Sequence, residues 1–238
     1  MSYALTTSSW QNGYRMVSFL QMGITMILFV TLPVWKVNKT AEQQEEQHEV
    51  IGIRGAVKIK GVPQLLLGFF SYCALESTLI LWSSSYLVGA KGISAERAAA
   101  YAALFCSGIT LGRFLAGFVT EKLGDHKMIR LGTTILLAGC AAVLLPIPSD
   151  TAGLVVMGIG CAPVYPSIIH ATPANFGEKN SQAIIGIQMA SAYVGSTFMP
   201  PVFGLIANHI SITLLPVYVL IFIVLMFFMV EKTFRLVR

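Results

Sequence analysis

The chain has 238 residues, of which 55% are hydrophobic and 11% are charged. Soluble domains contain roughly 25% charged residues, and so few charges cannot cover a water-exposed surface of this size. The composition therefore excludes an ordinary soluble protein and indicates that lipid covers much of the surface.

The formal net charge of +5 raises the question of a nucleic-acid partner. The basic residues cluster in the short segments between apolar runs, and no helix or strand pattern contains a basic stripe that would follow a phosphate backbone. Charges between apolar runs are typical of membrane topology signals instead. We therefore expect no nucleic acid among the partners.

Seven apolar runs are long enough to cross a bilayer, whose hydrocarbon core of about 30 Å requires roughly 20 helical residues. They lie approximately at residues 17–35, 63–88, 97–119, 128–147, 152–171, 182–207 and 213–230. The cysteines fall inside these runs without metal-ligand spacing, at Cys73, Cys106, Cys140 and Cys161, so we expect buried thiols, no metal and no cofactor. The sequence predicts an all-α, polytopic transmembrane helical bundle.

Lys and Arg residues are distributed unequally between the two sides of these spans. One side holds Lys36, Lys39, Arg54, Lys58, Lys60, Lys122, Lys127, Arg130, Lys179, Lys232, Arg235 and Arg238, and the other holds Arg15, Lys91 and Arg97. Cytoplasmic loops contain the excess of basic residues. We therefore expect a multi-pass plasma-membrane protein with a cytoplasmic carboxy terminus, in which residues 36–61 form a polar cytoplasmic linker.

An odd number of spans with a cytoplasmic carboxy terminus places Met1 outside, although no signal peptide is present to translocate it. The simpler account is that preceding spans are missing. We expect the chain to begin partway through a longer protein.

The most specific motif is residues 112–127, Gly-Arg-Phe-Leu-Ala-Gly-Phe-Val-Thr-Glu-Lys-Leu-Gly-Asp-His-Lys, at the cytoplasmic end of a span. Gly108, Gly112 and Gly117 would let a neighbouring helix approach closely, and Gly124 would allow a tight reversal. Arg113 and Glu121 are eight residues apart, so they could share a helix face and pair with an adjacent helix. The alternative is simple basic flanking of a span.

This motif resembles the signature loop of the major facilitator superfamily in its second-half form, except that Asp125 and His126 stand where more basic residues are frequent. The resemblance implies a gating role for Gly112, Arg113, Gly117, Glu121, Lys122, Gly124 and Lys127. It also implies that residues 1–35 are the end of an amino-terminal half and residues 62–238 a six-span carboxy-terminal domain. The missing amino-terminal half would then be a partner.

A second motif centres on Glu76, a carboxylate near the middle of an apolar run, where ionised groups are expensive and usually functional. At 100° per residue, a sector of roughly 80° around the helix axis contains Tyr72, Glu76, Ser83 and Tyr86, which form a polar stripe. Residues 72–76, with Trp82 and Tyr86, resemble the seventh span of the fucose-permease-like branch of the superfamily. The alternative is a Glu76 that only holds helices together.

A third motif contains Gln188, Ser191 and Gly195 on one face of the 182–207 run, which Pro200-Pro201 interrupts. Residues 160–166, which include Tyr165, and residues 188–195 resemble the tenth and eleventh spans of the same branch. For any single residue here, ordinary packing is the better interpretation.

The resemblance implies a secondary active transporter that works by alternating access. Aromatic rings and an amide near the midplane suit a small polar solute, a sugar or related metabolite, and the carboxylate of Glu76 favours a proton over sodium as the coupling ion. The substrate-binding or ion-coupling candidates are Glu76, Tyr72, Trp82, Ser83, Tyr86, Tyr165 and Gln188. Catalytic and nucleotide-hydrolysis motifs are absent, so we expect no enzyme. The alternatives are a non-transporting fragment or structural and regulatory half-protein, drug-type efflux, and a membrane-embedded enzyme.

Overall fold

The computed structural model describes residues 10–32, 52–144 and 150–237, and every regular element in these ranges is a helix. The chain divides into two compact units, Met1–Glu49 and Val50–Arg238. Across the described ranges, seven helices are long and apolar enough to cross a membrane. The predicted all-α, seven-span bundle is confirmed.

The first unit contributes helix α2 (Trp10–Thr31), and nearly all of its side chains from Gln11 onward are exposed. Its hydroxyl groups bond within the helix: Ser18 Oγ donates to the Tyr14 carbonyl and Thr25 Oγ1 to the Gln21 carbonyl, both at 2.9 Å. Because these hydroxyl groups are satisfied within the helix, they do not prevent it from facing lipid. The predicted span began later, and its last residues, 33–35, lie outside the described ranges.

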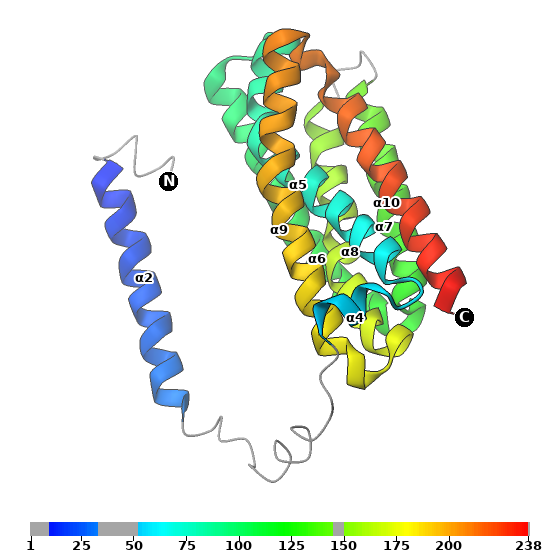
Figure 1. Cartoon of the computed structure of the whole chain (residues 1–238). Helices are drawn as coiled ribbons and strands as arrows, with labels where there is room; N and C mark the ends of the chain where they lie inside the picture. The colour runs from blue at the N-terminus through cyan, green and yellow to red at the C-terminus, as the bar shows by residue number, and fades with distance from the viewer. Residues whose placement is uncertain (1–9, 33–51, 145–149, 238) are drawn as a thin grey trace. The chain divides into compact units, whose positions relative to one another are not determined.

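The second unit contains a short helix and six long ones (Figure 1). They are α4 (Ile53–Val57), α5 (Val62–Lys91), α6 (Ala95–Leu123), α7 (Asp125–Leu144), α8 (Asp150–Phe176), α9 (Glu178–His209) and α10 (Leu215–Val237), with the 3₁₀ turn η2 (Ile212–Leu214) before α10. The long helices match the six predicted spans, usually with longer ends. Of the predicted linker, residues 36–51 lie outside the described ranges, and α4 occupies part of the remainder.

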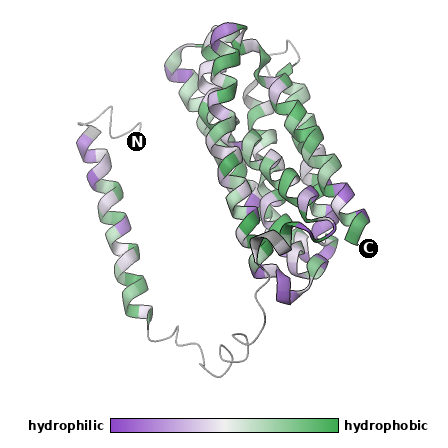
Figure 2. Cartoon of the chain, in the orientation of Figure 1, coloured by the Kyte–Doolittle hydropathy of each residue, from purple (hydrophilic) through white to green (hydrophobic). Residues whose placement is uncertain are grey.

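Helices α5 and α8 form the interior of the second unit. Helix α8 packs against α6 and α7, while α5 packs against α9 and α10. Phe69, Tyr72 and Leu75 of α5 are fully buried. Figure 2 shows the long helices mostly hydrophobic, with hydrophilic residues concentrated towards their ends. The helix on which sequence analysis placed Glu76 is therefore a core element.

Glycines allow α6 and α8 to approach each other at backbone distance. A Cβ atom on Gly108 would lie 2.5 Å from the Val155 carbonyl oxygen, and one on Gly112 would lie 2.5 Å from Ala162 Cβ. Gly117 makes no such contact among the described residues, because a Cβ atom there would meet nothing within 4 Å, and the same role for it stays a prediction. Gly124 has a φ of 72° in the one-residue connection from α6 to α7, which confirms the predicted tight reversal.

The expectation that all four cysteines are buried is partly wrong. Cys73, Cys140 and Cys161 are buried, whereas Cys106 is exposed. Helix α6 buries the face that contains Phe105, Gly108 and Gly112, and Cys106 projects from another face.

Candidate substrate and coupling site

Polar side chains from three helices meet near the middle of the second unit. Tyr72 and Glu76 come from α5, Arg113 from α6, and Tyr165 from α8; we call these four residues the midspan polar cluster. The Tyr72 hydroxyl donates to the Cys161 carbonyl at 3.0 Å, and the Tyr72 and Tyr165 rings lie 6.1 Å apart between centroids. The cluster thus brings together residues that are far apart in sequence.

Glu76 is half-buried near the midpoint of α5. Its carboxyl group lies close enough to interact with the Tyr72 hydroxyl and with the charge of the Arg113 guanidinium. The guanidinium side chain is exposed, and no ion pair within 4.0 Å joins it to Glu76 among the described residues. An ionised Glu76 would therefore face the Arg113 charge across a gap rather than in a closed ion pair.

A groove of about 470 Å³ opens beside the cluster between α6 and α8. Its walls are Arg113, Ala116, Gly117, Thr120, Tyr165 and Pro166. Because Gly117 has no side chain and open space where a Cβ would be, it helps to keep this groove open. An arginine, a hydroxyl and an aromatic ring around a groove of this size suit a small polar molecule.

The other candidates on α5 lie away from the cluster. Trp82 Nε1 donates to the Pro200 carbonyl at 3.0 Å, and the Trp82 ring meets the Phe203 ring edge-on at 5.5 Å. Ser83 is buried and donates to a carbonyl of its own helix, and Tyr86 is buried. The residues of the predicted polar stripe are therefore buried between helices, except for the half-buried Glu76.

Gln188 of α9 is fully buried rather than facing the groove. Its Oε1 accepts a hydrogen bond from Thr172 Oγ1 at 3.0 Å, and its Nε2 has no partner among the described residues. On the same face, Ser191 Oγ donates to the Leu66 carbonyl at 2.9 Å, and a Cβ on Gly195 would lie 2.6 Å from the Phe70 carbonyl oxygen. Ser191 and Gly195 therefore pack on α5 and Gln188 bonds to α8, in agreement with the packing interpretation.

The charges of the signature loop do not form the expected cross-helix pair. Glu121, Lys122 and Lys127 are exposed, and among the described residues neither Glu121 nor Arg113 takes part in an ion pair. The two departures from the family pattern do: Asp125 Oδ2 lies 2.8 Å from His170 Nδ1, and His126 Nε2 lies 3.0 Å from Glu231 Oε1.

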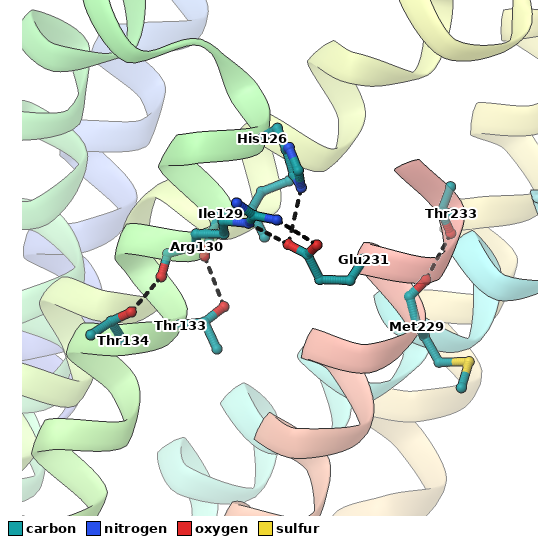
Figure 3. Close-up of polar contacts among 8 residues, drawn as sticks. All are labelled: His126, Ile129, Arg130, Thr133, Thr134, Met229, Glu231 and Thr233. Atoms are coloured by element: carbon teal, nitrogen blue, oxygen red, sulfur yellow. Dashed lines mark hydrogen bonds and ion pairs between the residues drawn. The ribbon is translucent and has the colours of Figure 1, made fainter. Parts of the chain in front are cut away.

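Glu231 is the centre of a second polar cluster, which sequence analysis missed (Figure 3). Arg130 engages both of its carboxylate oxygens, with Nη2 donating to Oε2 at 2.7 Å, while His126 approaches from the next helical turn. His126 and Arg130 are four residues apart on α7 and therefore share a face. That spacing, with a lone carboxylate ending the last apolar run, was the available signal.

Comparison with known proteins agrees with this architecture. The family profile of the Major Facilitator Superfamily matches residues 2–155 and 65–237, which together span nearly the whole chain. The chain belongs to the Major Facilitator Superfamily. Members of this superfamily are membrane proteins, and the seven apolar helices make this chain a multi-pass one.

Curated relatives within the superfamily are longer than this chain. An uncharacterized MFS-type transporter of Yersinia pestis is 26% identical over 160 residues, covering 63% of this chain and 40% of the relative. A putative glucose/galactose transporter of Helicobacter pylori is 27% identical over 154 residues, covering 62% of this chain and 36% of the relative. The chain thus spans less than half the length of these relatives.

Solved superfamily structures share the fold. The outward-facing structure of the transporter FucP superimposes with a TM-score of 0.62 at 19% identity, covering 74% of this chain and 43% of FucP. A variant structure of the same protein, the Escherichia coli fucose:proton symporter, gives a TM-score of 0.61 at 19% identity and covers the same shares of the two chains. The resemblance to a fucose-permease-like fold is confirmed at the level of fold.

Proposed function

We propose that this chain is the carboxy-terminal part of a secondary active transporter that moves a small polar solute, such as a sugar, by alternating access with a coupling proton. In the proposed layout, residues 1–35 end an amino-terminal half, residues 36–61 are a cytoplasmic linker, and residues 62–238 form the six-span domain. The protein lies in the plasma membrane with its carboxy terminus in the cytoplasm. The observation that supports this most strongly is the midspan polar cluster.

Glu76 has the properties of a coupling group. An ionised carboxylate in the middle of a span is costly unless a counter-charge or a cavity is near, and Glu76 interacts with Arg113, which lines the groove. When deprotonated, it attracts Arg113 and draws α5 towards α6. When protonated, it is neutral and retains only hydrogen bonding with neighbours such as Tyr72. Proton occupancy would thus change the attraction between α5 and α6, and Arg113 of α6 lines the groove.

The proposed solute class rests on the groove's chemistry and on the relatives. Tyr165 lines the groove, and its ring packs on the Phe69 ring at 4.9 Å between centroids. Such rings stack on sugar faces, while guanidinium and hydroxyl groups bind sugar hydroxyls. A putative glucose/galactose transporter and a fucose:proton symporter stand among the similar proteins. Together these favour a neutral polar solute over the drug-like cations of efflux proteins, which Arg113 would repel.

The missing amino-terminal half supplies the second wall of this site in our proposal. Helix α6 exposes Leu111, Phe114 and Phe118 together with Arg113, which is exposed in the same region. A face that contains an arginine close to the middle of a span is poorly suited to lipid. A six-span half packed on α6 would enclose the groove and the midspan polar cluster.

The test is Glu76→Gln in the full-length parent transporter, with two readouts. The amide keeps hydrogen bonding but cannot titrate. We expect uptake against a gradient to fall to background, whereas exchange of labelled for unlabelled solute across the membrane persists, because exchange needs no change in proton occupancy. The measurement is radiolabelled sugar uptake and counterflow in proteoliposomes.

The matched control is Glu96→Gln, which removes an exposed carboxylate at the start of α6. This variant should retain concentrative uptake. If Glu76→Gln also retains it with unchanged pH dependence, Glu76 only holds helices together. If exchange is lost too, Glu76 binds the solute and does not carry the coupling proton.

A further inference from the structure

A second groove runs along the outer side of α10, away from the residues of the midspan polar cluster. It has a volume of about 1110 Å³ and is lined by α10 from Val217 to Arg235, together with Arg130 of α7. Val217, Ile221 and Phe228 in its walls are 43–60% exposed. The groove is therefore accessible from the membrane on this unit.

The groove changes character along its length. Its walls are apolar from Val217 to Met229 and then charged, with Glu231, Lys232 and Arg235 at the carboxy-terminal end. From Val217 to Phe228 the helix rises about 16 Å at 1.5 Å per residue. One leaflet of a bilayer has about 15 Å of hydrocarbon, half of the 30 Å core. The apolar part of the groove thus matches the depth of one leaflet, and the charges fall where headgroups begin.

The charges at this end are predominantly positive. Glu231 is the carboxylate in the lining, and Arg130 and His126 already engage it (Figure 3). Lys232 and Arg235 are exposed, and neither forms an ion pair with another described residue. Arg130 remains 53% exposed although it binds Glu231. An anionic headgroup would therefore find at least two uncompensated cations next to a third.

We propose that this groove is a binding site for an anionic phospholipid, with acyl chains along Val217 to Phe228 and the headgroup phosphate at Lys232 and Arg235. Basic residues at the end of a span also occur simply as topology signals, but such residues need no apolar groove of leaflet depth beside them. The Arg130–Glu231 pair would link the occupied site to α7, because Arg130 belongs both to the groove and to the pair.

Native mass spectrometry of the purified 238-residue chain in detergent tests this proposal. The chain is titrated with phosphatidylglycerol and with phosphatidylcholine of identical acyl chains, and separately with glycerol 3-phosphate. We expect saturable binding of one phosphatidylglycerol, weaker binding of phosphatidylcholine, and no binding of glycerol 3-phosphate, since the headgroup alone lacks the apolar contacts.

Two variants examine the two parts of the groove. Each basic residue near a membrane surface contributes about fivefold to the binding of an anionic lipid. The double variant Lys232→Gln with Arg235→Gln should therefore weaken phosphatidylglycerol binding roughly 25-fold and leave phosphatidylcholine binding nearly unchanged. Val224→Trp fills the apolar part and should weaken both lipids. The control, Lys58→Gln with Lys179→Gln, removes two exposed basic residues that lie outside the groove and should change neither.

Equal affinity for the two lipids, or an equal loss in the control, would overturn the proposal and leave the basic residues as topology signals. It would also be overturned if the spectra showed a dimer of the chain that Val224→Trp abolishes, because a second copy would then occupy the groove.

Discussion

Asp125 and His126 illustrate how individual residues can depart from a family motif and acquire a structural role. More basic residues are frequent at these positions of the signature loop, and here each forms a contact with another helix, Asp125 with His170 of α8 and His126 with Glu231 of α10. Substitution of both by lysine would remove the carboxylate of α7 that faces His170 of α8 and place a longer cation beside Glu231. The departures therefore help to fix the loop end of α7 against two neighbours.

Loss of the Glu231 carboxylate should weaken the attachment of α10 to α7. Glu231→Gln leaves one oxygen and one amide donor facing the guanidinium of Arg130, so the two-point pairing becomes a single hydrogen bond beside an opposed donor. We expect the midpoint of thermal unfolding in detergent to fall by several degrees, measured by differential scanning fluorimetry. Glu178→Gln, at an exposed carboxylate, should leave the midpoint unchanged; an equal fall in both variants would contradict the role of the pair.

At this scale the sequence predicted some parts of the candidate site and missed others for identifiable reasons. Glu76 stood out because a carboxylate inside an apolar run is costly wherever it points. Trp82 and Gln188 have side chains that suit ligands equally well, and only tertiary structure shows that they bond to Pro200 and Thr172 instead. The spacing of His126 and Arg130 places both on one helix face, but their partner Glu231 lies more than 100 residues away, and local spacing alone does not identify that partner.

Among the elements, α8 determines how closely the second unit packs. One side of α8 packs closely against Gly108 and Gly112 of α6, and another side contacts α7. The sequence predicted helix positions well because apolar length is local information. It did not distinguish the glycines that touch a neighbour from those that do not, since Gly112 and Gly117 belong to the same motif and differ only in what faces them.

The two glycines give a matched pair of substitutions. Gly112→Ala would place a Cβ 2.5 Å from Ala162 Cβ and 2.9 Å from the Ile159 carbonyl oxygen, so α6 and α8 must separate. We expect a loss of about 1–3 kcal/mol in the free energy of unfolding, as for other overpacked contacts. Gly117→Ala meets open space and should be neutral or slightly stabilising, because alanine is the better helix former. Reversible unfolding in mixed micelles measures both, and equal effects would argue against the packing role.

For the whole molecule, the central fact is that the chain spans less than half the length of its curated relatives. We predict that the 238-residue chain alone does not transport, and that co-expression with its amino-terminal half restores uptake. A site between two halves needs both walls, and the groove beside Arg113 is open on one side without them. Proteoliposomes with an imposed proton gradient and labelled sugars provide the measurement.

The described residues contain seven apolar helices of membrane-spanning length, an odd number, so two copies would not reproduce a six-plus-six arrangement. Saturable uptake by the chain alone would contradict this prediction and show that one copy, or an assembly of copies, completes the site. Uptake that appears only after co-expression would support it.

The predicted orientation has a direct test in intact cells. A cysteine introduced at Gln44, within the expected linker, should react with an impermeant maleimide only after the membrane is permeabilised, because the basic excess places this segment in the cytoplasm. The background needs Cys106→Ser, since Cys106 is the exposed native thiol among the four cysteines. Rapid labelling from outside would contradict the predicted topology and place this segment on the outer side of the membrane.

The contact of Trp82 with Pro200 and Phe203 also provides an intrinsic optical probe. The chain has three tryptophans, and Trp82 is the one in residues 50–238. With Trp10 and Trp35 replaced by phenylalanine, all indole emission would come from the junction of α5 and α9. Its Nε1 is hydrogen-bonded and its ring meets Phe203 edge-on. Any transport step that shears α5 past α9 would break that bond and shift the emission maximum, so the turnover of the assembled transporter could be followed without an added label.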